Sequence, residues 1–169
     1  VGPRITESMS KQVGEVLFDQ GIRLEKAGAT HAAIMAYTSA IEEPFTNVEQ
    51  RTDAQIRLGN LLLWAEGPYA ALPYLEAVAR EDEHSIWVYL PLCEALLQTN
   101  RTEDCLRLCS EWFERAERLK DMRQKADAKL LQGRAYLSQN DSEQALQAFL
   151  VGQQADPGLL GLDGAQGVG

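Results

Sequence analysis

The sequence predicts an all-α protein built from four successive helix-turn-helix units. Four segments share one spacing, in which a small residue is followed by a bulky residue three positions on, a turn, and a second small residue twelve positions after the first. The first small residues lie 38, 34 and 40 residues apart, at Gly21, Gly59, Cys93 and Gly133. Gly, Asn, Asp and Pro separate the apolar stretches, as is typical of helix ends. A recurring spacing of this length indicates a helical repeat protein.

The first two units contain four expected helices, over residues 11–26, 31–43, 47–65 and 68–80. Exposed amides at a helix start favour a side-chain acceptor, and Thr46 followed by Glu49 fits a capping box. Pro68 suits the first turn of its helix, where no amide donor is needed.

The last two units are expected to form helices over residues 85–98, 103–120, 123–139 and 142–155. Residues 1–10 show no helical period, and residues 158–169 hold five glycines, which disfavour a helix. We therefore expect a repeat domain over residues 11–157 with a flexible segment at 1–10 and a flexible Gly-rich tail at 158–169.

The repeat pattern is similar to a known family. The fourth unit carries it most clearly, in Gly133, Tyr136, Asn140, Asp141, Ala145, Phe149, Asp156 and Pro157. The first unit follows closely, with Gly21, Leu24, Gly28, Ala33, Tyr37, Ala40 and Pro44. With two helices per unit and a period near ~34 residues, residues 11–157 resemble a tetratricopeptide repeat (TPR) array. The resemblance implies a right-handed superhelical solenoid of about four units.

Length and composition exclude some classes of protein. The 169 residues are 45% hydrophobic, which suits one sizeable core. No apolar run approaches the ~18 residues of a membrane span, so we expect no membrane insertion. The first residue is Val1 rather than Met, which is compatible with a fragment of a longer protein. A cytoplasmic location is the default expectation.

The net charge of −9 argues against nucleic-acid binding, because a phosphate backbone would be repelled by most of the surface. The exception is a basic segment over residues 115–125. Glu114, Glu117 and Asp121 alternate with its cations, so we interpret it as a solvated helix face.

The three cysteines occupy positions where a repeat packs one helix against the other. Cys93, Cys105 and Cys109 stand where Gly, Ala and an aromatic residue are usual, and we interpret them as small core residues. The alternative is a metal or redox cluster with His84 nearby, since Cys105 and Cys109 are one helical turn apart. No fourth ligand has suitable spacing, so we expect no metal and no cofactor.

Catalytic residues are scarce. His31 and His84 are the only histidines, and the sequence has no phosphate loop, nucleophile elbow or zinc-protease motif. We therefore expect a protein that is not an enzyme and has no catalytic residues.

The resemblance implies a concave groove lined by the first helix of each unit. The positions expected to form a peptide-binding groove are Phe18, Ile22, Ile56, Asn60, Leu63, Trp64, Trp87, Leu90, Glu94, Leu97, Leu130, Arg134 and Leu137. Soluble monomers rarely leave so apolar a patch bare, so we expect it to bind an apolar peptide or helix of another protein. The alternative is that the curvature of the array buries part of this stripe. The polar members Asn60, Glu94 and Arg134 could fix the register of a ligand.

Chaperone-binding members of the family resemble one another in a Lys/Asn/Arg clamp for a C-terminal carboxylate. The corresponding positions are Phe18, Ile22, Arg57, Trp87 and Pro91, of which only Arg57 is compatible. We predict no such clamp. The expected function is that of an adaptor, scaffold or chaperone-like module.

The alternative function is self-assembly into a homo-oligomer through an uncapped fourth repeat. It rests on the lack of a visible capping helix and on Leu159, Leu160 and Leu162 in the tail.

Overall fold

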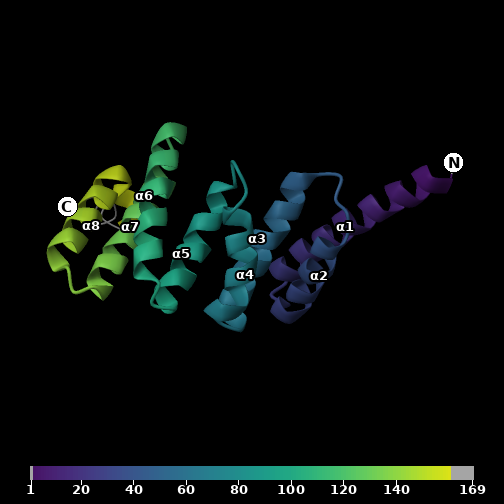
Figure 1. The fold of residues 1–169 in the computed structure, drawn as a ribbon, viewed down its shortest axis with the longest axis horizontal. Helices are drawn as coiled ribbons and strands as arrows, with labels where there is room; N and C mark the ends of the chain where they lie inside the picture. The colour runs from purple at the N-terminus through teal and green to yellow at the C-terminus, as the bar shows by residue number, and fades with distance from the viewer. Residues whose placement is uncertain (1, 161–169) are drawn as a thin grey trace. The chain divides into compact units, whose positions relative to one another are not determined.

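The computed structural model describes residues 2–160, with side chains described over 13–158. It divides into two compact units, one ending at Ser85 and the other beginning at Ile86. Figure 1 labels their helices α1 to α8. Each unit holds two helix hairpins. Each of the eight expected helices has a counterpart among the described residues, and the all-α prediction is confirmed. Helix α5 begins at Tyr89 rather than at Ser85, because residues 86–88 form a 3₁₀ turn.

The first unit contains two hairpins, α1 with α2 and α3 with α4, and α3 also contacts α1 and α2. The helices are α1 (Gly2–Lys26), α2 (Thr30–Glu42), α3 (Val48–Ala65) and α4 (Pro68–Ala79). The first helices of the two repeats, α1 and α3, are therefore neighbours.

The second unit has the same plan, with α5 packed on α6, α7 packed on α8, and α7 in contact with both α5 and α6. Two 3₁₀ turns, η1 and η2, flank these helices. The elements are η1 (Ile86–Val88), α5 (Tyr89–Gln98), α6 (Thr102–Leu119), α7 (Met122–Ser138), α8 (Ser142–Ala155) and η2 (Pro157–Leu160).

Two expectations at the chain ends differ from the structure. Helix α1 begins at Gly2, nine residues before the expected start at Lys11, so residues 2–10 are helical rather than irregular. An apolar period reports burial, whereas extending an existing helix needs only one backbone hydrogen bond per added residue. At the other end, η2 covers Pro157–Leu160, and the rest of the expected flexible tail lies outside the described residues.

Helix starts follow local chemistry with one correction. Asn47, not Thr46, caps α3, because its Oδ1 accepts hydrogen bonds from the amides of Glu49 at 2.9 Å and Gln50 at 3.3 Å. The amide of Thr46 instead donates to Glu15. Pro68 lies in the first turn of α4, as predicted.

Each hairpin turn contains one residue with positive φ: Gly28 at 78°, Gly67 at 110°, Asn100 at 60° and Asn140 at 60°. Gly and Asn adopt this backbone conformation most easily, which is why they end the first helices.

The core of three hairpins is a close contact between a glycine and a large side chain sixteen residues later. A Cβ on Gly21 would lie 2.5 Å from the ring of Tyr37, and one on Gly59 would lie 2.6 Å from Leu75. In the fourth repeat, Gly133 meets the ring of Phe149 in the same way. This contact lets the two helices of each of these three repeats approach closely.

Candidate functional site

In the first unit, the expected groove residues on α1 and α3 separate into a buried and an exposed set. Phe18, Ile56 and Leu63 are 6%, 7% and 4% exposed, so their side chains belong to the core rather than to an open surface. Asn60 is exposed, and Trp64 is 70% exposed near the end of α3.

The half-buried Ile22 completes the expected set in the first unit. Phe18 packs on Tyr37 with ring centroids 6.2 Å apart, which accounts for part of its burial. Part of the expected groove is therefore buried within the protein itself, because Phe18, Ile56 and Leu63 are core residues.

Arg57 is already engaged by carboxylates. Its Nε lies 3.2 Å from Asp53 and its Nη1 lies 3.3 Å from Oε1 of Glu25. The same Glu25 oxygen accepts a 2.6 Å hydrogen bond from the hydroxyl of Tyr37. Burial and this bond to Glu25 raise the pKa of Tyr37 above its usual value. The one residue compatible with a carboxylate clamp thus has two internal acidic partners.

In the second unit, the expected residues form two stripes on neighbouring helices. Leu90, Glu94 and Leu97 share one face of α5, because residues three and four positions apart lie one above the other on a helix. Leu130, Arg134 and Leu137 share one face of α7 by the same spacing. We call these six residues the α5/α7 surface.

An ion pair joins the two stripes of the α5/α7 surface. Arg134 donates two hydrogen bonds to Glu94, at 2.5 Å to Oε1 and 3.0 Å to Oε2. The bond with Glu94 raises the pKa of Arg134. Because the pair is bidentate, it holds α5 and α7 side by side at this level.

The apolar members of the α5/α7 surface keep contact with solvent. Leu90 is 40% exposed and Leu137 is 48% exposed, while Leu97 and Leu130 are half-buried. Trp87, in η1 one turn before Leu90, is 67% exposed. The second unit therefore presents exposed leucines on both sides of a charged pair.

Helix α8 carries a separate apolar face. Leu146 is 59% exposed, Leu150 is 48% exposed and Val151 is 38% exposed. Phe149 packs against Gly133 instead and is half-buried.

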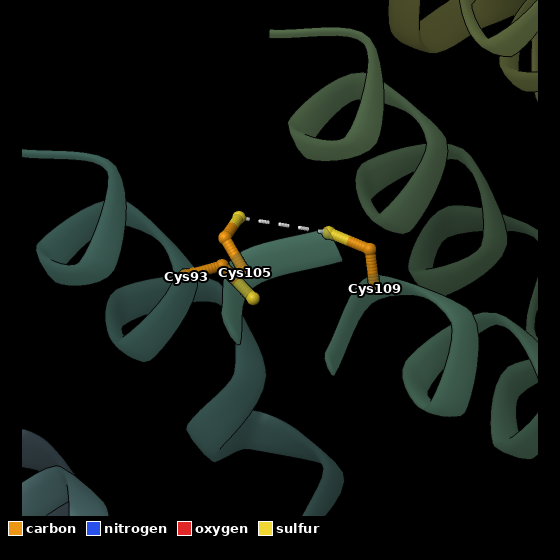
Figure 2. Close-up of side chains that lie close together, drawn as sticks. All are labelled: Cys93, Cys105 and Cys109. Atoms are coloured by element: carbon orange, nitrogen blue, oxygen red, sulfur yellow. Dashed lines mark hydrogen bonds between the residues drawn. The ribbon is translucent and has the colours of Figure 1, made fainter. Parts of the chain in front are cut away.

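The three cysteines converge in the core of the third repeat (Figure 2). Cys93 comes from α5, and Cys105 and Cys109 come from consecutive turns of α6. Their Sγ atoms all lie within 4.8 Å of one another, and Cys105 and Cys109 are hydrogen bonded at 3.9 Å. Their exposed fractions are 0%, 0% and 1%.

The close approach of these thiols couples their ionisation. Hydrogen bonds from Cys109 and Cys93 lower the pKa of Cys105, whereas the bonds to Cys105 raise the pKa values of the other two thiols. The three thiols therefore do not ionise independently of one another. The sequence indicated core positions for all three cysteines, with a metal or redox cluster as the alternative. The sixteen-residue spacing that joins Gly21 to Tyr37 also joins Cys93 to Cys109.

The two histidines belong to the first unit. His31 is exposed at the start of α2. Nδ1 of His84 lies 3.1 Å from the carbonyl oxygen of Glu81, in the segment that follows α4. None of the described helices is long and apolar enough to cross a membrane.

Comparison with known proteins finds similar structures but no similar sequence family. No family model matches the chain, and no curated protein matches it in sequence. Among solved structures, YrrB, described as a TPR protein with an unusual peptide-binding site, is 19% identical with a TM-score of 0.73. That match covers 90% of this chain and 74% of YrrB.

Two structures of MamA are also similar. MamA AMB-1 is 19% identical with a TM-score of 0.68, and the match covers 86% of this chain and 80% of MamA. MamA MSR-1 is 20% identical with a TM-score of 0.66, and the match covers 85% of this chain and 77% of MamA. The chain therefore has the all-α helical repeat fold of tetratricopeptide repeat proteins.

Proposed function

We propose that this protein is a non-enzymatic protein-interaction module that binds an apolar peptide or helix of a partner along α5 and α7, the first helices of its third and fourth repeats. The observation that carries the proposal is the α5/α7 surface, where Leu90 and Leu137 remain 40% and 48% exposed on neighbouring helices. YrrB, which shares the fold, is described as having a peptide-binding site.

The energetics favour a ligand with large apolar side chains. Fully burying one leucine contributes about 1.5–3 kcal/mol, so covering the exposed parts of Leu90 and Leu137 contributes about 1 kcal/mol each. A matching ligand side chain contributes a similar amount, and the cost of ordering the ligand is subtracted. Several such anchors are needed for micromolar affinity, about −8 kcal/mol.

The polar members of the surface define the register of the ligand. Glu94 and Arg134 satisfy one another, so a ligand that crosses them need not supply a charge. In the first unit, exposed Asn60 and Trp64 offer a second place for a ligand amide and a ligand aromatic group. No carboxylate clamp is proposed, because Arg57 already holds Asp53 and Glu25.

Selection from a displayed library of random 15-residue peptides would test the proposal without knowledge of the partner. We expect the selected peptides to be rich in Leu, Ile, Phe or Trp. Their affinity should fall more than about tenfold, or 1.4 kcal/mol, for the Leu90→Glu/Leu137→Glu variant. The exposed positions of these leucines make the variant compatible with folding, which circular dichroism would verify.

A matched control carries the same charge change elsewhere. Leu119→Glu/Met122→Glu alters two side chains that are 61% and 65% exposed, at the end of α6 and the start of α7. It should bind within about twofold of the parent. Equal weakening by both variants, or selection of peptides whose binding depends on an acidic C-terminus, would contradict the proposal.

A second candidate function is self-assembly through the apolar face of α8. Leu146, Leu150 and Val151 are exposed together on that helix. Sedimentation would then detect an oligomer that grows with concentration, is lost in Leu146→Glu/Leu150→Glu and is kept in Leu90→Glu/Leu137→Glu. A monomer at all concentrations would remove this candidate.

A further inference from the structure

In the other three repeats a glycine packs against a large side chain sixteen residues later, whereas the third repeat has cysteines at both positions. The residues at its first small position, twelve residues on and sixteen residues on are Cys93, Cys105 and Cys109. In the fourth repeat the same three positions hold Gly133, Ala145 and Phe149. The hairpin backbone thus aims all three side chains at one point, and in the third repeat each of them ends in a thiol (Figure 2).

We propose that Cys93, Cys105 and Cys109 form a three-thiolate binding site for monovalent copper. Thiolate is a soft ligand that favours Cu(I), and Cu(I) is stable with three sulfur ligands in a trigonal plane. Binding replaces three S–H bonds with three Cu–S bonds and releases three protons, with no change in oxidation state.

The dimensions of the cluster suit an ion at its centre. Metal–sulfur bonds of ~2.3 Å in a trigonal plane place the sulfurs about 4.0 Å apart. The Sγ atoms of Cys105 and Cys109 are already 3.9 Å apart, and all three pairs lie within 4.8 Å. The remaining contraction is below about 1 Å per pair and is within the reach of cysteine side-chain rotation.

The ligand count favours Cu(I) over Zn²⁺. Structural zinc takes four ligands, and the group of His, Cys, Asp and Glu atoms that converges here among the described residues has only three members. All three are buried, so solvent supplies a fourth ligand poorly. A three-coordinate monovalent ion fits both facts.

A neighbouring lysine partly offsets the charge of the site. A Cu(I) ion with three thiolates carries a net charge of −2, which is costly to bury alone. Lys129 supplies a positive charge near Cys109, whereas the charge of Arg134 is already paired with Glu94. Lys129 is itself half-buried, with its ammonium 4.5 Å from the ring centroid of Phe113.

Anaerobic titration of the reduced protein with Cu(I), against the chelator bicinchoninate, tests the site. We expect one Cu(I) per chain to be taken from the chelator. X-ray absorption of the loaded protein should show three sulfur neighbours at about 2.3 Å. Fewer than three sulfurs, or copper remaining on the chelator, would overturn the proposal.

Cu(I) affinities of two variants test whether binding needs the three thiols at these particular positions. Cys105→Ala is the mildest change, because Ala33, Ala71 and Ala145 occupy this position in the other repeats. It should weaken Cu(I) binding more than tenfold. Cys105→Ala/Leu119→Cys restores the number of thiols at an exposed position and should not restore binding. If it binds as tightly as the parent, the cluster is only part of the core. The absorption measurement on the parent decides the question if a variant fails to fold.

Discussion

The third and fourth repeats are both helix hairpins, but their largest side chains lie in different turns of the second helix. In the fourth repeat the large side chain is Phe149, which covers Gly133, and Gly152 follows one turn later. In the third repeat the order is reversed, because Cys109 takes the place of Phe149 and Trp112 takes the place of Gly152.

The residue of the first helix that faces this position also differs between the two repeats. Trp112 stacks on Tyr89 with ring centroids 5.7 Å apart and planes 7° from parallel. The equivalent contact in the fourth repeat joins Gly152 to Lys129, where an added Cβ would lie 3.1 Å from the Cβ of Lys129. The two hairpins therefore place their large and small residues at opposite positions in adjacent turns. In the third repeat the level left for small side chains is the one that holds three thiols.

Removal of the large side chain should have the largest effect in the third repeat. Trp112 is 0% exposed, and Trp112→Ala should lower the free energy of unfolding by about 3–5 kcal/mol. Phe149 is only half-buried, so Phe149→Ala should cost less, about 2–3 kcal/mol. Urea denaturation of both variants checks the order. A greater loss for Phe149→Ala would mean that the stack is not the main contact of the third repeat.

Alanine at the first small position should be more destabilising in the fourth repeat than in the third. Gly133→Ala places a methyl group against the ring of Phe149 and should cost about 2–3 kcal/mol. The reciprocal Cys93→Ala removes only a sulfur atom and should cost about 1 kcal/mol. Thermal unfolding of the pair measures the difference. If Gly133→Ala is neutral, the close approach of α7 and α8 is not rigid.

The indole of Trp112 also fixes the third repeat to the next helix. Its Nε1–H donates a 2.8 Å hydrogen bond to Oε1 of Gln124, which is 5% exposed. Trp112→Phe keeps an aromatic ring over Tyr89 but leaves the Gln124 oxygen without this donor, which should cost about 1–2 kcal/mol. Adding Gln124→Leu should recover part of that loss in urea denaturation. No recovery would show that the hydrogen bond contributes little.

Alkaline pH should lower the free energy of unfolding through buried tyrosines, which the first and third repeats have in their cores and the fourth repeat replaces with Phe149. The pKa of Tyr37 is raised above about 10, so its native state keeps a proton that the unfolded chain loses. This contribution to stability is complete below pH 10 and is lost as the pH rises further. Tyr37→Phe should reduce the fall in the free energy of unfolding between pH 9 and pH 11. An unchanged fall would assign the alkaline sensitivity elsewhere, with Tyr89, whose pKa burial also raises, as the next position to change.

The positions of the helices were predictable because their end signals are local. Gly28, Gly67 and Asn140 mark turns through their own backbone preferences, whatever surrounds them. The start of α1 at Gly2 was not predictable from an apolar period, since that period reports which residues are buried. The cap at Asn47 was missed because Thr46 is an equally suitable residue type.

The candidate site was less predictable, because exposure depends on neighbouring elements. Phe18, Ile56 and Leu63 have the spacing of surface residues in the family but are buried here. The pairing of Glu94 with Arg134 joins residues forty positions apart, and no local signal announces it. The meeting of Cys93 with Cys109 did have a signal, in the sixteen-residue spacing that each repeat shares. Peptide binding by the remaining residues stays a prediction.

The three tryptophans offer the most direct test of where a ligand binds. Trp64 and Trp87 are 70% and 67% exposed, whereas Trp112 is fully buried and hydrogen bonded. We would record the indole N–H signals by NMR while adding a selected apolar peptide, with Trp64→Phe and Trp87→Phe used for assignment. The account predicts that the signal of Trp87, one turn from Leu90, shifts with saturation while that of Trp112 stays in place. A titration that leaves Trp87 unchanged and instead shifts the amides of Leu146 and Leu150 would contradict it.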